Sequence, residues 1–251
     1  MQSSYTPGYS RNATDFMAGR SFESHGHFFS NHLKPGDSVL DCGCGPGTIT
    51  MGLAERVFPG QVIGVDVREM QVASAQTTAR QSGIRNASFQ VADCHSLPFA
   101  DNSFDRVFSN ALVEHLPNPV QMLKELHRVL KPGGLAGICA PDWGGFVLAP
   151  PSAALESAVT SYTSLQLANG GDVRVGRKLG LHLTSAGFHH VDLSARYECI
   201  TPLASIAEYL ALQLDREGDS ESATTFRSWG RETAGLFALC WISAIGRKHS
   251  P

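Results

Sequence analysis

Apolar residues recur along the chain with two different spacings. Short apolar runs, typical of buried strands, alternate with stretches whose apolar residues lie three or four positions apart, as on one helix face. Lys-Pro-Gly, Pro-Gly and Gly-Gly steps, which commonly end helices or form turns, separate several of these segments. The pattern predicts strands at 38–42, 61–65, 88–92, 106–109, 135–140, 190–200 and 239–247, and helices at 20–33, 48–57, 68–81, 119–130, 177–186 and 204–229.

The most regular part of this pattern lies between residues 34 and 140. Strands that alternate with helices at this spacing are typical of β-α-β units, so we expect an α/β fold with a mostly parallel, doubly wound sheet. The segments 1–33, 141–176 and 202–232 are less regular, and residues 1–18 resemble a loose arm. We expect a single domain over residues 1–251, in which these segments cap the carboxyl ends of the strands.

Charge and composition argue against several classes of protein. The net charge is −3 and no basic cluster occurs, so a nucleic-acid partner is not expected. No apolar stretch reaches the roughly 18 residues of a membrane span, and the polar N-terminus does not resemble a secretion signal, so we expect a cytoplasmic protein. The six cysteines form no Cys-x-x-Cys pair, which favours free thiols and no metal site.

A glycine-rich loop, DCGCGPGT at residues 41–48, follows the first expected strand and opens a helix. Glycines let a ligand approach the backbone, and the helix start offers free N–H groups. Alone, the loop indicates either a nucleotide site or a tight strand-to-helix turn. Its spacing differs from the G-x-G-x-x-G of dinucleotide loops, and the Asp41 carboxylate would repel a pyrophosphate. We therefore favour S-adenosylmethionine, which carries positive charge, over a nicotinamide dinucleotide.

Acidic residues also end the next two expected strands. Asp66 lies 19 residues after Gly47, a distance that suits a carboxylate binding both hydroxyls of a ribose. The alternative is a solvated acid that caps the next helix. Asp93, at the end of the third strand, could accept a hydrogen bond from an adenine amino group. Acids at three successive strand ends favour one nucleoside site over coincidence.

Four motifs together carry a family resemblance: VLDCGCGPGTIT, VIGVDV, FQVADCHSLPFADNSFDRVFSNALVEHL and LKPGGL. They resemble the class I S-adenosylmethionine-dependent methyltransferases, especially the small-molecule enzymes related to the ubiquinone and menaquinone C-methyltransferases. The resemblance covers about residues 20–140. It implies a Rossmann-like seven-stranded sheet whose last strand runs antiparallel, with S-adenosylmethionine as the cofactor.

The resemblance also implies roles for individual residues. Gly43 and Gly45 would border the methionine moiety, with Asn110 near the same end. Arg20 resembles an arginine that some relatives direct at the cofactor carboxylate. Asp66 would bind the ribose, while Asp93 and Cys94 would flank the adenine. The expected cofactor-binding set is Arg20, Asp41, Gly43, Gly45, Asp66, Val67, Asp93, Cys94 and Asn110.

Candidates for acceptor chemistry follow the fourth and fifth strands. His115 has the intrinsic pKa of a general base, although a structural histidine is an alternative. Glu114 could face the substrate, the backbone or the cofactor edge. Trp143 could form a pocket wall or pack in the core, and Tyr9 could close over the site or lie on the surface. His25 is interpreted as a solvated or structural residue.

The leading hypothesis is a methyltransferase that acts on a nitrogen, oxygen or carbon nucleophile of a small molecule. A catalytically silent S-adenosylmethionine-binding regulator or partner subunit is the alternative. A dehydrogenase is disfavoured by the loop spacing and by Asp41. The sequence is compatible with a homo-oligomer, and it does not identify the acceptor.

Overall fold

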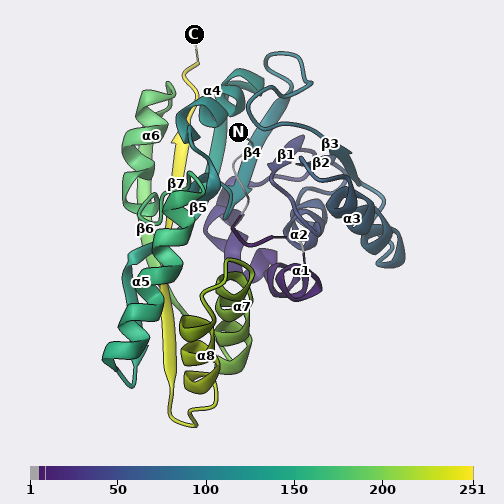
Figure 1. The fold of residues 1–251 in the computed structure, drawn as a ribbon. Helices are drawn as coiled ribbons and strands as arrows, with labels where there is room; N and C mark the ends of the chain where they lie inside the picture. The colour runs from purple at the N-terminus through teal and green to yellow at the C-terminus, as the bar shows by residue number, and fades with distance from the viewer. Residues whose placement is uncertain (1–5, 9, 251) are drawn as a thin grey trace.

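The chain forms a seven-stranded sheet flanked by helices (Figure 1). The computed structural model describes residues 6–8 and 10–250. The strand order is β3-β2-β1-β4-β5-β7-β6, and β7 runs antiparallel to both of its neighbours while the other pairs are parallel. The predicted Rossmann-like fold is therefore confirmed. The strands are β1 (Val39–Cys42), β2 (Val62–Asp66), β3 (Ala87–Val91), β4 (Phe104–Asn110), β5 (Leu130–Ala149), β6 (His189–Cys199) and β7 (Leu236–Arg247).

Two apolar layers cover the sheet because strand side chains alternate between its faces. On one face, Leu40 and Val107 belong to a core that includes α4 (Pro119–Val129) and α6 (Leu179–Ser185). On the other face, Val39 and Phe108 belong to a core with α2 (Thr48–Val57), beside which α3 (Glu69–Gln81) packs on Phe89. All strand residues named here are buried.

The N-terminal region differs from the expected loose arm and single helix. Helix α1 (Arg11–Ala18) begins where the Ser10 Oγ accepts a hydrogen bond from the Ala13 N–H at 3.2 Å. Residues 20–33 instead form a π-helical turn, η1 (Phe22–Gly26), and a 3₁₀ helix, η2 (His27–His32). A Cβ on Gly26 would lie only 2.4 Å from the Phe22 ring. Close packing at Gly26 therefore accompanies the change of helix type.

The fifth strand is much longer than the predicted 135–140, and the seventh begins three residues before the predicted 239–247. The two strands pair as an antiparallel ribbon from Leu135–Arg247 to Ala149–Leu236, with a register shift between Asp142 and Val147, and β6 accompanies β7 as far as Ala238. In Figure 1, β7 is the long yellow strand that reaches the lower end of the molecule, and α7 and α8 lie beside its lower part. A separate apolar core there joins the ribbon to α1, α5 (Ala153–Ala168), α7 (Leu203–Arg216) and α8 (Ser220–Trp229). The helical region predicted at 204–229 consists of two helices, α7 and α8, because Gly218 interrupts it with φ 87°.

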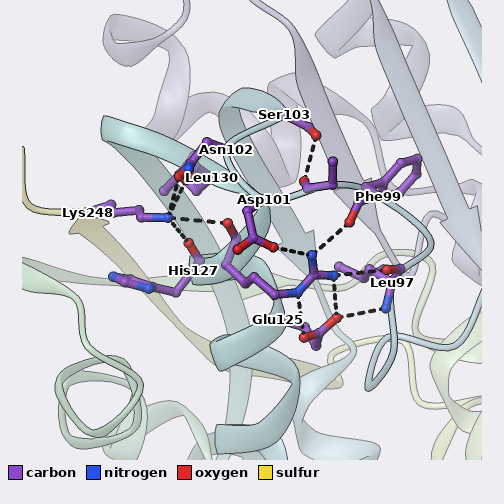
Figure 2. Close-up of polar contacts among 11 residues, drawn as sticks. Leu97, Phe99, Asp101, Asn102, Ser103, Glu125, His127, Leu130 and Lys248 are labelled. Atoms are coloured by element: carbon purple, nitrogen blue, oxygen red, sulfur yellow. Dashed lines mark hydrogen bonds and ion pairs between the residues drawn. The ribbon is translucent and has the colours of Figure 1, made fainter.

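A polar network secures the loop between β3 and β4 (Figure 2). The Arg128 guanidinium, at the end of α4, donates to the Glu125 and Asp101 carboxylates and to two loop carbonyls, those of Leu97 and Phe99. Lys248 donates to the Leu130 carbonyl at 2.7 Å and to two further carbonyls at the same helix end. These contacts join the loop, α4 and the end of the chain's last strand.

Candidate active site

A cavity of about 440 Å³ opens at the carboxyl ends of β1, β2, β3 and β4. Most of the expected cofactor residues line it, together with His115. They come from four separate strand ends and from the segment after α1, so the fold gathers residues that are distant in sequence. The expected residues on its wall are Arg20, Gly43, Gly45, Asp66, Val67, Asp93, Cys94 and Asn110.

The glycine loop is braced by Asp66. The Asp66 Oδ2 accepts a hydrogen bond from the Gly45 N–H at 3.0 Å, and its Oδ1 accepts one from the Arg68 N–H at 3.0 Å. Gly45 has φ 50°, and a Cβ built on it would meet no atom within 4 Å, so its surface is open to a ligand. Burial raises the pKa of Asp66. The carboxylate thus holds the loop and borders the cavity at the same time.

Asp41 is the exception among the expected cofactor residues, because it does not line the cavity. Its side chain is buried behind the loop, where Oδ2 accepts a hydrogen bond from the Thr50 hydroxyl at 2.6 Å. Burial raises the pKa of Asp41 to about 7. The structure therefore corrects the expected ligand contact: Asp41 joins β1 to the first turn of α2.

The far end of the cavity carries the loop after β3. The Asp93 Oδ1 accepts a hydrogen bond from the His95 backbone N–H at 2.9 Å and also lies 3.0 Å from His95 Nδ1. The hydrogen bond from the backbone lowers the pKa of Asp93. Cys94 lies between them, and the ligand atoms of all three residues lie within 4.8 Å of one another. Burial raises the pKa of the Cys94 thiol to about 12, which disfavours the thiolate that a metal would need.

A second cavity, of about 430 Å³, lies beside the first, under α1, α5 and α7. Glu114 and Trp143, which were expected to contact the substrate, line it, and so does His25, which the sequence had suggested to be solvated or structural. Tyr9 lies outside the described residues. The wall is rich in aromatic rings. Four of these residues could not be predicted from the sequence, because an isolated aromatic residue in a helix or strand is most simply explained by core packing. These four are Phe16, Tyr162, Tyr209 and Trp241.

Arg20 and His115 line both cavities. The Arg20 guanidinium carbon lies 5.3 Å from the Trp241 ring centroid and 5.9 Å from that of Phe16, within the range of cation–π attraction. The Arg20 carbonyl accepts a hydrogen bond from the Thr48 hydroxyl at 2.6 Å, which links this segment to the glycine loop. The two cavities therefore meet at one basic side chain and one imidazole.

Burial shifts the pKa values of the adjacent residues Glu114 and His115 in opposite directions, in each case toward the uncharged form. Burial raises the pKa of Glu114 to about 7, while burial and the nearby Arg20 charge lower the pKa of His115 to about 3. The Glu114 Oε1 lies 3.7 Å from His115 Nε2, and its Oε2 is buried without a hydrogen-bond partner. At neutral pH the imidazole is uncharged, and the carboxyl group is close to its midpoint of titration.

Backbone contacts hold Glu114 and Trp143 in place. The Glu114 carbonyl accepts hydrogen bonds from the Asp172 N–H at 2.8 Å and from the Gln166 side chain at 3.2 Å. The Trp143 N–H donates to the Val173 carbonyl at 2.9 Å, and its buried ring lies 4.9 Å from that of Tyr162. Trp143 therefore serves as both core and cavity wall.

The methyltransferase domain family matches residues 33–171. The sterol 24-C-methyltransferase ERG6B of Gibberella zeae is 36% identical over an alignment 258 residues long, and the alignment covers 94% of this chain and 64% of the relative. A demethylmenaquinone methyltransferase of Symbiobacterium thermophilum is 37% identical over 105 residues, covering 41% and 42% of the two chains. The chain spans about half the length of several curated relatives, for example 49% of an uncharacterized methyltransferase of Schizosaccharomyces pombe.

Solved structures share the fold at lower sequence identity. A putative methyltransferase from Bacillus halodurans has a TM-score of 0.65 at 20% identity, covering 87% of this chain and 95% of its own. The [4+2]-cyclase SpnF has a TM-score of 0.59 at 23% identity, covering 95% and 80%. No described helix is long and apolar enough to cross a bilayer. The fold is shared by proteins with different names, but the domain match spans more than half of the sequence, and the chain belongs to the methyltransferase domain family.

Proposed function

We propose that the protein transfers a methyl group from S-adenosylmethionine to a small molecule. The observation that carries this proposal is the pair of adjoining cavities, each of about 430 to 440 Å³, that share Arg20 and His115. The cavity at the glycine loop takes the cofactor, and the cavity under the cap takes the acceptor. Methyl transfer needs the two reactants in line and in contact, and adjoining sites provide that arrangement.

The cofactor cavity suits a cationic nucleoside. Asp66 and Asp93 stand at its wall, and Asn110 offers a buried Oδ1 that has no hydrogen-bond partner in the described structure. Asn110 Oδ1 would accept from the ammonium group, Asp66 from the ribose hydroxyls, and Asp93 from the adenine amino group. When bound, the cofactor would supply an electrophilic methyl group on its sulfonium. Phosphoethanolamine N-methyltransferase 2 of Haemonchus contortus, which has this fold, was solved with S-adenosylhomocysteine.

The acceptor cavity suits a molecule with an apolar ring system and a polar group. Aromatic rings form much of its wall, while Trp241 Nε1 and Glu114 Oε2 are buried polar atoms without partners in the described structure. Such atoms are costly unless a ligand satisfies them. Relatives named for sterol and demethylmenaquinone methylation are consistent with a ring-bearing acceptor. The described wall of this cavity carries one arginine, Arg20, and no lysine, which also favours a small molecule over a nucleic acid.

Glu114 is the better candidate for accepting a proton from the acceptor. A general base works best when its pKa lies near the working pH, and the pKa of Glu114 is about 7. His115 was the base expected from the sequence, but a pKa of about 3 makes its imidazole a weak proton acceptor. We assign His115 a positioning role as a neutral hydrogen-bonding group between the two cavities, with Arg20 directed at the cofactor carboxylate.

The test is a screen of metabolite extracts with an isotopically labelled methyl donor, followed by mass spectrometry of the products. Transfer of label to a discrete small molecule, reduced with the Asp66→Ala variant when the donor is below saturation, is the expected result. Tight cofactor binding without transfer to any of the extracts would favour the silent binding protein instead. Binding of NAD in place of S-adenosylmethionine would favour a dehydrogenase.

A further inference from the structure

Strand β6 lies at the edge of the sheet with one of its sides unpaired. Among the described strands it pairs only with β7, in a regular register from Asp192–Ile245 to Cys199–Ala238. Residues 192–195 are all exposed. An exposed edge strand presents a row of unsatisfied N–H and C=O groups, which proteins usually protect with proline, lysine or a covering segment. Residues 192–199 contain neither proline nor lysine.

The two faces of this strand have different chemistry. Leu193 and Tyr197 are 55% and 57% exposed, and Leu193 lies against Gly180 of α6, where the neighbouring Leu181 is 68% exposed. This α6 side therefore carries an exposed apolar stripe. On the opposite face, Arg196 stacks near the Trp241 ring, with its guanidinium carbon 5.8 Å from the centroid. Alternation along a strand places Asp192, Ser194 and Arg196 on that second face.

From these features we infer that β6 pairs with β6 of a second copy of the chain, antiparallel, about a two-fold axis through Ser194. In this register each residue lies opposite the residue at the same distance on the other side of Ser194. Asp192 of one copy lies opposite Arg196 of the other, twice by symmetry. Leu193 lies opposite Ala195, so the apolar stripes of the two copies join into one.

The charges select this register over its neighbours. An axis through Ala195 would place Asp192 opposite Glu198, two like charges, and an axis through Leu193 would place Asp192 opposite Ser194. Neither Asp192 nor Arg196 forms an ion pair within 4.0 Å among the described residues of its own chain. Opposite charges directly across a strand pair stabilise it, and like charges destabilise it. Within one chain Arg196 feels the charge of Glu198, and its Nη2 is buried without a hydrogen-bond partner among the described residues. The pairing would therefore add a direct ion pair that the described chain lacks for both Asp192 and Arg196.

The ladder is short and sharply bounded. The β6–β7 register shifts between His189 and Asp192, and His190 adopts φ 49°, so the regular edge begins at Asp192. The two-fold register consequently pairs residues 192–196 of both copies, about the length of an average strand. The side chains of 192–196 line neither cavity, so a dimer would leave both cavities open.

Sedimentation of charge variants tests the inference on the intact chain. The wild-type chain should form a dimer, and Asp192→Arg or Arg196→Asp alone should each raise the dimer dissociation constant about tenfold or more, because symmetry applies each change twice. The double variant Asp192→Arg/Arg196→Asp restores opposite charges and should restore the dimer. Circular dichroism of each variant confirms that it folds. A chain that stays monomeric at high micromolar concentration, or a dimer indifferent to both single changes, would overturn the inference.

Cross-linking tests the position of the axis. Residues directly opposite in an antiparallel pair have Cα atoms about 4.5–5.5 Å apart, within the range that a disulfide spans. Ser194→Cys should therefore give a disulfide-linked dimer under mild oxidation. Ser82→Cys, an exposed serine at the end of α3, is the matched control and should stay at the level of the wild-type chain. Equal cross-linking of both variants would exclude an axis at Ser194.

Discussion

The adjacent residues Glu114 and His115 show how burial decides the role of an ionisable side chain. Both are removed from water, and burial always disfavours the charged form. The carboxyl pKa therefore rises to about 7, while the imidazole pKa falls to about 3. Among the described residues, Arg20, His115, Cys139 and Tyr209 are ionisable groups that interact with Glu114. The sequence suggested the histidine as the base, because a sequence supplies only the unperturbed pKa values of its side chains.

The Glu114→Gln variant tests this assignment once an acceptor is known. With the wild-type enzyme, kcat should rise with pH through about 7, as Glu114 loses its proton. The variant should lose this inflection and about 10²- to 10⁴-fold in kcat, the usual worth of a general base, with KM changed far less. Glu114→Asp should recover part of the loss. A pH profile and kcat unchanged by Glu114→Gln would remove the proton-accepting role from this residue.

Asp41 provides a test of stability against pH. Its pKa rises from 3.8 to about 7 on folding, so the folded state holds a proton that the unfolded state has lost between these values. The free energy of unfolding due to this group therefore falls as pH rises across that window. Asp41→Asn removes the titration but keeps an oxygen that accepts from Thr50. The Tm of this variant minus that of the wild-type protein should therefore become larger as the pH is raised from below 3.8 to above 7. A Tm difference independent of pH would contradict the burial argument.

Residues at strand ends were predictable, whereas of the acceptor cavity only Glu114 and Trp143, which follow strands, could be anticipated. Asp66 and Asp93 stand where parallel strands end, and the fold alone brings those ends together. The direction of a side chain is a different matter: Asp41 also ends a strand, yet Thr50 binds it behind the loop. Tyr162 and Trp241 come from a cap helix and a cap strand whose packing has no sequence signature. The sequence could therefore indicate the cofactor and not the acceptor.

At the scale of elements, most strands were located well, including β6 to within one residue, whereas β5 and the segment before β1 were not. The pattern predicted 61–65 and 88–92, and β2 and β3 differ from these by one residue at each end. Leu130 already pairs with Phe104, so β5 starts before the Lys-Pro-Gly-Gly segment that resembles a turn. The helix predicted at 20–33 forms as π-helical and 3₁₀ turns, and Phe22 there packs on Gly52 of α2, a tertiary contact that local pattern does not report.

The Arg128 network makes a prediction about how the β3–β4 loop is held. Arg128→Met removes two ion pairs and two bonds to loop carbonyls, so it should lower the free energy of unfolding by about 1–3 kcal/mol in urea denaturation. The side chain is 31% exposed, which favours the lower half of this range. Arg85→Met, at an exposed position without an ion pair among the described residues, is the control and should change stability by less than about 0.5 kcal/mol. Equal effects of the two changes would show that the network does not stabilise the fold.

At the scale of the whole molecule, a common cofactor-binding sheet is joined to a separate cap. The sheet carries the glycine loop and the three strand ends, while the extended β5–β7 ribbon supports α5, α7 and α8 over the second cavity. The domain match ends at residue 171, so α7, α8 and β7 lie beyond it. This division explains how relatives with different named substrates can share the sheet. Pairing of β6 edges would leave both cavities accessible in each copy.

Calorimetric titration of the wild-type chain measures whether the glycine-loop cavity binds S-adenosylmethionine. We expect saturable binding of one S-adenosylmethionine per chain and no binding of NAD. Asp66→Ala should weaken that binding about tenfold to a hundredfold, the cost of losing a charge-assisted hydrogen-bond acceptor. Asp66→Asn, which still accepts from the Gly45 N–H, controls for a disturbed loop. Failure of S-adenosylmethionine to bind at high micromolar concentration would show that the chain does not use this cofactor. An unchanged affinity in Asp66→Ala would show that the glycine-loop cavity is not where it binds.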